Sequence, residues 1–325
     1  MFLLFLILAM IAAVFCISLY TYKRCFYAAV RPVENIENVP GGEQYQAVKE
    51  RLVEISRIME MADCERVTMT ARDGTALAGR YYCVREGAPL MILFHGYRSM
   101  ALRDSAGGFA LAHKLDMNVL AVDQRSHGKS EGHVITFGIR ERLDCLSWIE
   151  YANSRLGAST PIILSGLSMG AATVLMATEL DLPSNVVCVM ADCPYSSPAA
   201  IIHKVCLDEH FPADLCAPLI WLGARIFGKF NLSEASAVTA VEKAQIPIIL
   251  FHGEDDRFVP CDMSREIFDH CGCRAELHTF PDAGHGLCYI SDPRRYERLC
   301  VRFLLSIPQL QPYLEASEFV KSVMK

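Results

Sequence analysis

Apolar residues fall in short continuous runs along most of the chain, and stretches with helical spacing separate these runs. The runs cover residues 90–94, 119–122, 162–164, 186–191, 246–251 and 275–280. Helical spacing marks residues 102–115, 139–154, 168–180, 261–270 and 294–305. Strands that are apolar at every position are typical of a parallel sheet covered by helices on both faces. The pattern therefore predicts an α/β fold with a mostly parallel sheet.

The chain before residue 90 predicts one hairpin and one amphipathic helix. Residues 67–82 turn at Asp73-Gly74, a dipeptide that favours a tight hairpin turn. Residues 43–61 carry apolar side chains three or four positions apart, so we expect a single helix with one apolar face.

The first residues predict a membrane anchor. No charged side chain occurs from Phe2 to Tyr20, and Lys23 and Arg24 follow. About 20 apolar residues in a helix cross a bilayer. A cleaved signal peptide is the alternative, but the basic leading region is missing and the apolar run is longer than usual. We expect an uncleaved anchor in residues 1–24.

Charge and cysteine content predict the side of the membrane. Lys23, Arg24 and Arg31 all follow the apolar run, so the positive-inside rule places the large domain in the cytoplasm. The chain has 14 cysteines without the compact spacing of a disulfide framework, which favours a reducing compartment. We expect a single-pass protein.

Composition changes along the chain predict its domains. Residues 25–66 form a linker and the amphipathic helix, residues 67–306 the main domain, and residues 307–325 a tail. Residues 195–243 interrupt the strand–helix rhythm with prolines and apolar helical stretches. We expect a helical insertion there that caps the site, with a helix pair that merely packs on the domain as the alternative.

Several function classes find no support. The net charge of −6 argues against a nucleic-acid partner. The chain has no Gly-rich phosphate loop or dinucleotide fingerprint in a plausible context, and its Cys/His cluster at residues 270–278 lacks zinc spacing. We therefore expect neither a metal nor an organic cofactor.

A G-x-S-x-G motif at residues 166–170 supplies the strongest chemical signal. It stands between an apolar β-branched run and the start of a predicted helix. In that setting a serine sits on a sharp turn as an exposed nucleophile, which makes Ser168 the candidate. Gly166 and Gly170 leave room where a Cβ would clash. A plain strand–helix turn in a protein that is not an enzyme is the alternative.

A serine nucleophile needs a base, an acid and donors for the oxyanion. His285, between two glycines after the last predicted strand, is the candidate base. Asp256, in the H-G-x-x-D-x-x-V-P stretch of residues 252–260, is the candidate acid, with Asp255 and Asp192 as alternatives.

The backbone N–H groups of Met169 and Tyr97 are the expected oxyanion donors, because one begins a helix and the other follows the first parallel strand. His95 and His252 are expected to brace loops. Asp123 and Arg125 are expected to form a structural ion pair.

The motifs F-H-G-Y, D-Q-R-S-H-G-K-S, G-L-S-M-G, H-G-E-D-D-R-F-V-P and A-G-H-G resemble those of the α/β-hydrolase superfamily in order and spacing. In detail the chain is similar to bacterial BEM46-like and serine-aminopeptidase-like hydrolases with an N-terminal anchor. The resemblance covers residues 67–306. It implies an eight-stranded sheet with an antiparallel second strand, and a triad of Ser168, Asp256 and His285. It says almost nothing about substrate.

We expect a carboxylesterase-like serine hydrolase that cleaves lipid-derived or short acyl esters through an acyl-Ser168 intermediate. Its partners would be a small acyl ester and the membrane, with no nucleic acid. A peptidase or amidase of the aminopeptidase-like branch is the second hypothesis. A membrane-tethered binding module without catalysis is the third.

Overall fold

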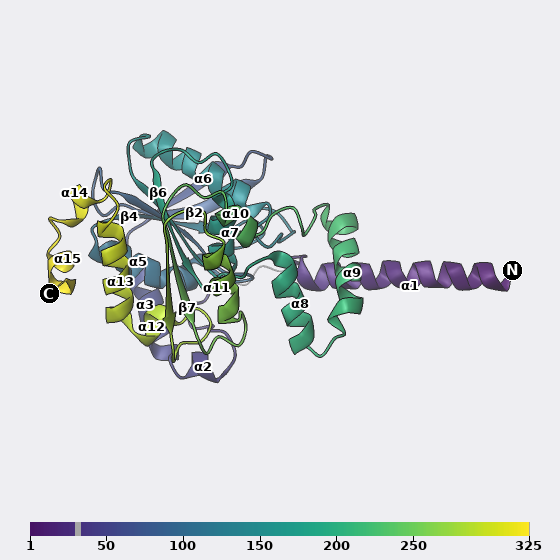
Figure 1. The fold of residues 1–325 in the computed structure, drawn as a ribbon. Coiled ribbons are helices and arrows are strands. Elements are labelled where there is room, and N and C mark those ends of the chain that lie inside the picture. Colours follow the sequence, from purple (N-terminus) through teal and green to yellow (C-terminus); the bar gives the residue numbers. More distant parts are fainter. Residues whose placement is uncertain (30–33, 325) are drawn as a thin grey trace.

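A computed structural model describes residues 1–29 and 34–324, and its centre is one eight-stranded sheet (Figure 1). The strand order is β1-β2-β4-β3-β5-β6-β7-β8, and only β2 runs antiparallel to its neighbours. The strands are β1 (Glu65–Thr70), β2 (Ala76–Tyr82), β3 (Leu90–Phe94), β4 (Asn118–Asp123), β5 (Ile162–Leu167), β6 (Val186–Asp192), β7 (Ile248–Gly253) and β8 (Ala275–Phe280). The predicted fold class, including the antiparallel second strand, is confirmed.

Helices cover both faces of this sheet (Figure 1). One face packs against α6 (Glu141–Leu156), α7 (Met169–Ala177), α10 (Ala237–Val241) and α11 (Cys261–Asp269). The other packs against α3 (Lys49–Met61), α4 (Ala101–Asp104), α5 (Ala106–Lys114), α12 (Cys288–Ser291) and α13 (Pro293–Leu305). Along β3, Met91 and Leu93 join one core while Ile92 joins the other. Two buried faces explain why the central strands are apolar at every position.

The helix predicted over residues 43–61 is divided in two. A short α2 (Glu43–Gln46) ends before Val48, and α3 follows it. The hydroxyl of Tyr45 on α2 donates a hydrogen bond to the backbone carbonyl of His285, at 2.9 Å. The break lets α2 meet this loop while α3 packs on the sheet, so one apolar stripe serves two surfaces.

The C-terminal residues pack on the domain through two short helices, α14 (Gln311–Leu314) and α15 (Glu318–Val323). Leu314 and Val320 are buried in the same core as α13. Residues 30–33 of the predicted linker, which include Arg31, and residue 325 of the predicted tail lie outside the described residues.

The insertion at residues 195–243 contains α8 (Pro198–Asp208), α9 (Ala213–Gly223), the π-helix η1 (Ala224–Gly228) and α10. The N-terminal helix α1 (Phe2–Cys25) projects away from the sheet, and α9 lies across its C-terminal part (Figure 1). Tyr22 and Phe26 are buried in a third core with residues of the insertion. The most apolar 18 residues of α1 have a mean hydropathy of 3.0, so this helix is long and apolar enough to cross a membrane, a property shared by anchors and signal sequences.

Candidate active site

Ser168 occupies a strained turn between β5 and α7. Its φ and ψ of 56° and −116° lie outside the regions that ordinary residues adopt. A Cβ on Gly166 would lie 2.3 Å from the carbonyl carbon of Gly170, and a Cβ on Gly170 would lie 2.1 Å from the carbonyl oxygen of Phe94. Only glycine fits at either position, which is the physical reason for the G-x-S-x-G spacing.

The structure brings Ser168, His285 and Asp256 together from three distant parts of the chain. The Ser168 Oγ lies 2.9 Å from the His285 Nε2, and the His285 Nδ1 lies 2.6 Å from the Asp256 Oδ2. All three residues are at most 9% exposed. The imidazole can therefore take a proton from the hydroxyl on one side while the carboxylate holds its other nitrogen.

Asp256 is held as a carboxylate by its surroundings. Burial alone would raise its pKa, but hydrogen bonding and charge interaction with His252 and His285 hold that pKa well below its ordinary value. The backbone N–H groups of Phe258 and Val259 donate to its Oδ1, at 2.9 and 2.8 Å. The neighbouring Asp255 is exposed, so it is Asp256 that faces the imidazole.

Asp192, the other candidate acid, lies at the end of β6 and lines the same cavity. Its backbone carbonyl accepts the N–H of Ser168 at 2.8 Å. Its side-chain Oδ1 has no hydrogen-bond partner among the described residues, and burial raises its pKa to about 6. Asp192 therefore supports the turn through its backbone and carries a carboxyl that ionises at a higher pH than an ordinary aspartate.

Replacing Asp192 by asparagine is expected to change how stability depends on pH. The Asp192 pKa rises from 3.8 in the unfolded chain to about 6 in the folded protein. Between these values the folded state binds more protons, so stability falls as pH rises through about 6. Two pKa units correspond to about 3 kcal/mol.

Urea unfolding of the detergent-solubilised chain at pH 4 and pH 7.5 measures this effect. The stability of Asp192→Asn relative to wild type should rise by about 2–3 kcal/mol between the two values. A difference independent of pH would contradict the raised pKa.

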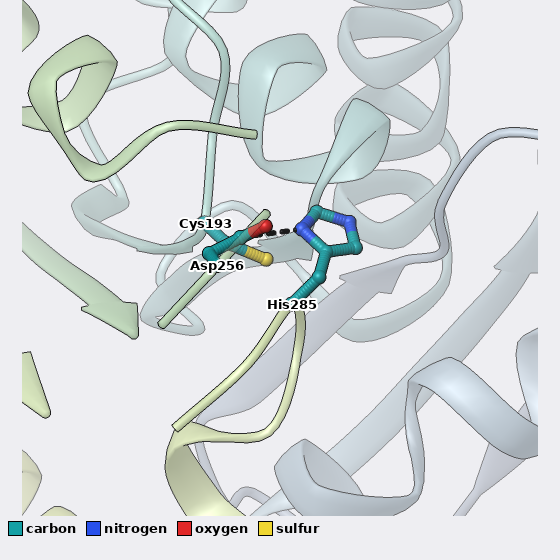
Figure 2. A group of neighbouring side chains, drawn as sticks. All are labelled: Cys193, Asp256 and His285. Atoms are coloured by element: carbon teal, nitrogen blue, oxygen red, sulfur yellow. Dashed lines mark hydrogen bonds and ion pairs between the residues drawn. The ribbon is translucent and has the colours of Figure 1, made fainter. Parts of the chain in front are cut away.

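Cys193 is a neighbour of the triad that sequence reasoning missed. Figure 2 shows its thiol beside the Asp256 carboxylate, which is joined to His285 by the dashed hydrogen bond. One ligand atom from each of the three residues lies within 4.8 Å of the others. A metal ion held there would compete with the Asp256–His285 bond, and burial raises the pKa of the Cys193 thiol. These three side chains therefore suit proton transfer better than metal coordination.

The loop after β3 lies beside the nucleophile. A Cβ on Gly96 would lie 3.5 Å from the Ser168 Cβ, so the adjoining Tyr97 backbone is near the hydroxyl. His95 Nε2 accepts the N–H of Gln124 at 3.0 Å, and its brace role is confirmed. The oxyanion roles of the Tyr97 and Met169 N–H groups stay predictions.

The expected ion pair between Asp123 and Arg125 is wrong. Arg125 instead binds the carboxylate of Asp144 on α6 through two guanidinium nitrogens and Asp73 through a third, at 2.9 Å. Asp123 accepts the backbone N–H of Lys129 at 3.0 Å.

A cavity of about 490 Å³ opens beside Ser168. Its walls include Tyr45 from α2 and Leu52 and Ile55 from α3, a contribution that helical periodicity did not reveal. Among the described residues, none from the insertion lines this cavity. Residues 40–55 thus contribute to the wall of the cavity, and a capping role for residues 195–243 stays a prediction.

Comparison with known proteins places these features in a family. The model of the alpha/beta hydrolase family matches residues 91–299. The uncharacterized protein YqkD of Bacillus subtilis is 22% identical over 232 residues, which cover 71% of this chain and 76% of YqkD. The protein bem46 of Schizosaccharomyces pombe is 23% identical over 288 residues, covering 84% and 83% of the two chains.

Solved structures agree with this fold. The Pyrococcus furiosus esterase Pf2001 has a TM-score of 0.62 at 20% identity, covering 86% of this chain and 99% of that one. Est1E of Butyrivibrio proteoclasticus, solved with ferulic acid bound, has a TM-score of 0.56 at 18% identity, covering 73% and 98%.

Proposed function

The chain belongs to the alpha/beta hydrolase family, and on that premise we propose that it is a serine hydrolase that cleaves carboxylic esters. One observation carries the proposal: an unbroken line of hydrogen bonds joins Ser168, His285 and Asp256 at the edge of a cavity. Two structural neighbours, Pf2001 and Est1E, are described as an esterase and as a ferulic acid complex, which supports the same class.

The reaction begins with transfer of the Ser168 proton to the His285 Nε2 while the Oγ attacks the ester carbonyl carbon. The tetrahedral oxyanion accepts hydrogen bonds from the Met169 and Tyr97 N–H groups. As the intermediate collapses, the bond to the alcohol oxygen breaks and His285 returns its proton to that oxygen. Water then repeats the sequence on the acyl-Ser168 ester and releases the carboxylic acid, while Asp256 stabilises the imidazolium.

The cavity favours an apolar acyl group. Leu52, Ile55, Leu93 and Ile290 form part of its wall. Burying each methylene of an acyl chain against such a wall contributes about 0.8 kcal/mol. The proposed substrates are therefore lipid-derived or short acyl esters.

A peptidase or amidase is less well supported. A charged peptide terminus needs an opposite charge in the cavity, and the acidic residues considered for that role, Asp208, Glu209 and Asp214, lie outside its lining. Arg103 and Arg257 do line the cavity, and the Arg103 guanidinium is bonded to Asp104 and to the carbonyl of Asn38. A purely binding module would not require the connected triad.

We also propose that α1 is an uncleaved, single-pass anchor with the domain on the cytoplasmic side. Ser18 and Tyr22 are buried against the insertion, so removal of α1 would expose apolar surface of the folded domain. Lys23 and Arg24 in the last turn of α1 favour the cytoplasmic side.

Intact-protein mass spectrometry after treatment with a fluorophosphonate probe tests the proposed function. The full chain in detergent should gain a single adduct that Ser168→Ala abolishes and that the exposed Ser233→Ala retains. Hydrolysis of an ester and an amide of one acyl group then separates the two enzyme classes. A well-folded wild type that gains no adduct would contradict the proposal, and faster cleavage of the amide would favour the peptidase.

A further inference from the structure

Helix α1 contacts the insertion closely. The rings of Phe15 and Phe227 meet edge to face at 5.3 Å between centroids. A Cβ on Gly223 would lie 2.4 Å from the carbonyl oxygen of Ser18, so the backbones of α1 and α9 touch there. Because α1 ends in this contact, its position in a bilayer also sets the position of α9 and η1.

The apolar run of α1 includes residues that pack on the insertion. About 20 apolar residues in a helix cross a bilayer, and the uncharged run Phe2–Tyr20 has this length. The last part of that run, from Phe15 onward, contacts α9 and η1. We propose that α9 and η1 dock against the lipid surface and enter the interfacial layer of the leaflet that faces the domain. This inference rests on α1 being a membrane anchor.

The outward residues of the insertion suit this contact. Leu215 and Trp221 on α9 and Ile226 on η1 are 71%, 39% and 48% exposed, while Leu207 on α8 and Phe211 in the α8–α9 connection are 56% and 54% exposed. Exposed apolar side chains on neighbouring elements, such as α8, α9 and η1, are typical of a membrane contact. Trp221 is the residue type enriched at the interface.

The orientation of α9 agrees with an in-plane position. Figure 1 shows α9 lying across α1, on the side from which α1 leaves the domain. With α1 along the membrane normal, α9 lies roughly parallel to the surface, as interfacial helices do. Its one charged residue, Asp214, has its carboxylate 3.6 Å from the Nε2 of His203 on α8.

Exposed cations surround the same junction. Lys23 and Arg24 end α1, while Arg225 and Lys229 lie on and just after η1. These side chains are placed to meet phosphate groups of the lipid surface when the apolar residues enter it. Asp208 at the end of α8 is paired with Lys204, while Glu209 in the α8–α9 connection is exposed. The surface therefore fits a bilayer that contains anionic lipid.

Docking would also bring the candidate active site to the membrane. The Tyr97 hydroxyl donates to the carbonyl of Cys25 at the end of α1, at 2.7 Å. Tyr97 belongs to the loop beside Ser168, so a single side chain separates the anchor from the proposed oxyanion donor. A lipid ester could then reach the cavity with a short exposure to water.

The two tryptophans of the chain allow a direct test. Trp221 is exposed on α9, whereas Trp148 is fully buried in the domain core. The full chain is reconstituted in vesicles of phosphatidylcholine and phosphatidylglycerol whose chains are brominated near the carbonyl end. Bromine should remove most of the Trp221 emission, and Trp221→Phe should leave only the unquenched Trp148 signal.

Changing the apolar surface adds a matched control. The double variant Leu215→Ser, Ile226→Ser should lose most of the quenching, whereas Ile58→Ser on α3, at a residue that is 55% exposed, should retain it. A chain that floats with the vesicles and shows no quenching overturns the docking surface and leaves the anchor standing. A chain that does not float with the vesicles overturns the anchor and the docking surface together. Neither outcome alters the fluorophosphonate result, so the proposed chemistry is tested separately.

Discussion

Replacing Ser168 by alanine is expected to lower kcat for hydrolysis of a soluble model ester by about 10⁴- to 10⁶-fold. The hydroxyl forms the covalent bond to the acyl group, and its Oγ lies 2.9 Å from the His285 Nε2 that takes its proton. Among the described residues, no other hydroxyl is hydrogen-bonded to the His285 imidazole. Initial rates at saturating substrate measure the loss directly.

The controls for Ser168→Ala separate chemistry from folding. Alanine fills less space than serine at a 7% exposed position, so circular dichroism and the unfolding midpoint should stay close to wild type. KM should change little, because the cavity walls remain. Ser233→Ala, an exposed serine in the insertion, should keep full activity. A loss below about tenfold in Ser168→Ala would contradict nucleophilic catalysis at this residue.

The strands were predictable because their pattern follows from burial on both faces. Every residue of β3, β4 and β7 is buried, and the predicted runs overlap all three strands. The turn at Ser168 was predictable because its two glycines respond to contacts within a few residues and with the neighbouring strand. Close contacts of this kind restrict a position to one residue type, so the sequence pattern reveals them.

The sequence did not predict that residues of α2 and α3 would line the cavity beside Ser168. Tyr45 and His285 are 240 positions apart, and the Tyr45 hydroxyl still donates to the His285 carbonyl. An apolar position at helical spacing indicates that a residue packs inward, but the pattern carries no information about its partner. The same limit explains why Arg125 was paired with the wrong carboxylate.

The contact between α1 and the insertion was missed for a related reason. A long apolar helix at the start of a chain is interpreted as an isolated anchor. Only the structure shows that Gly223 admits the backbone of α1 and that Tyr22 is buried there. Helix α1 and the insertion thus pack as one structural unit, although hydropathy distinguishes the apolar helix from the rest of the domain.

Replacing Asp256 by asparagine is expected to lower kcat by about 10⁴-fold. The Oδ1 of Asp256 accepts backbone N–H groups of Phe258 and Val259, so the oxygen of an asparagine would take that place. Its NH₂ group would then face the His285 Nδ1, now 2.6 Å from the Oδ2. That donor favours the tautomer with the proton on Nε2, which cannot accept the proton of Ser168.

Asp255→Asn is the matched control, because it makes the same chemical change at the next residue. Asp255 is exposed, so its loss should leave kcat within about twofold of wild type. Both variants should bind substrate with a similar KM, since neither side chain lines the cavity. If Asp255→Asn lost as much activity as Asp256→Asn, the acid would be misassigned. If neither lost activity, His285 would be oriented by another group, and Asp192 would be the first to test because it lines the cavity at the end of the adjacent strand.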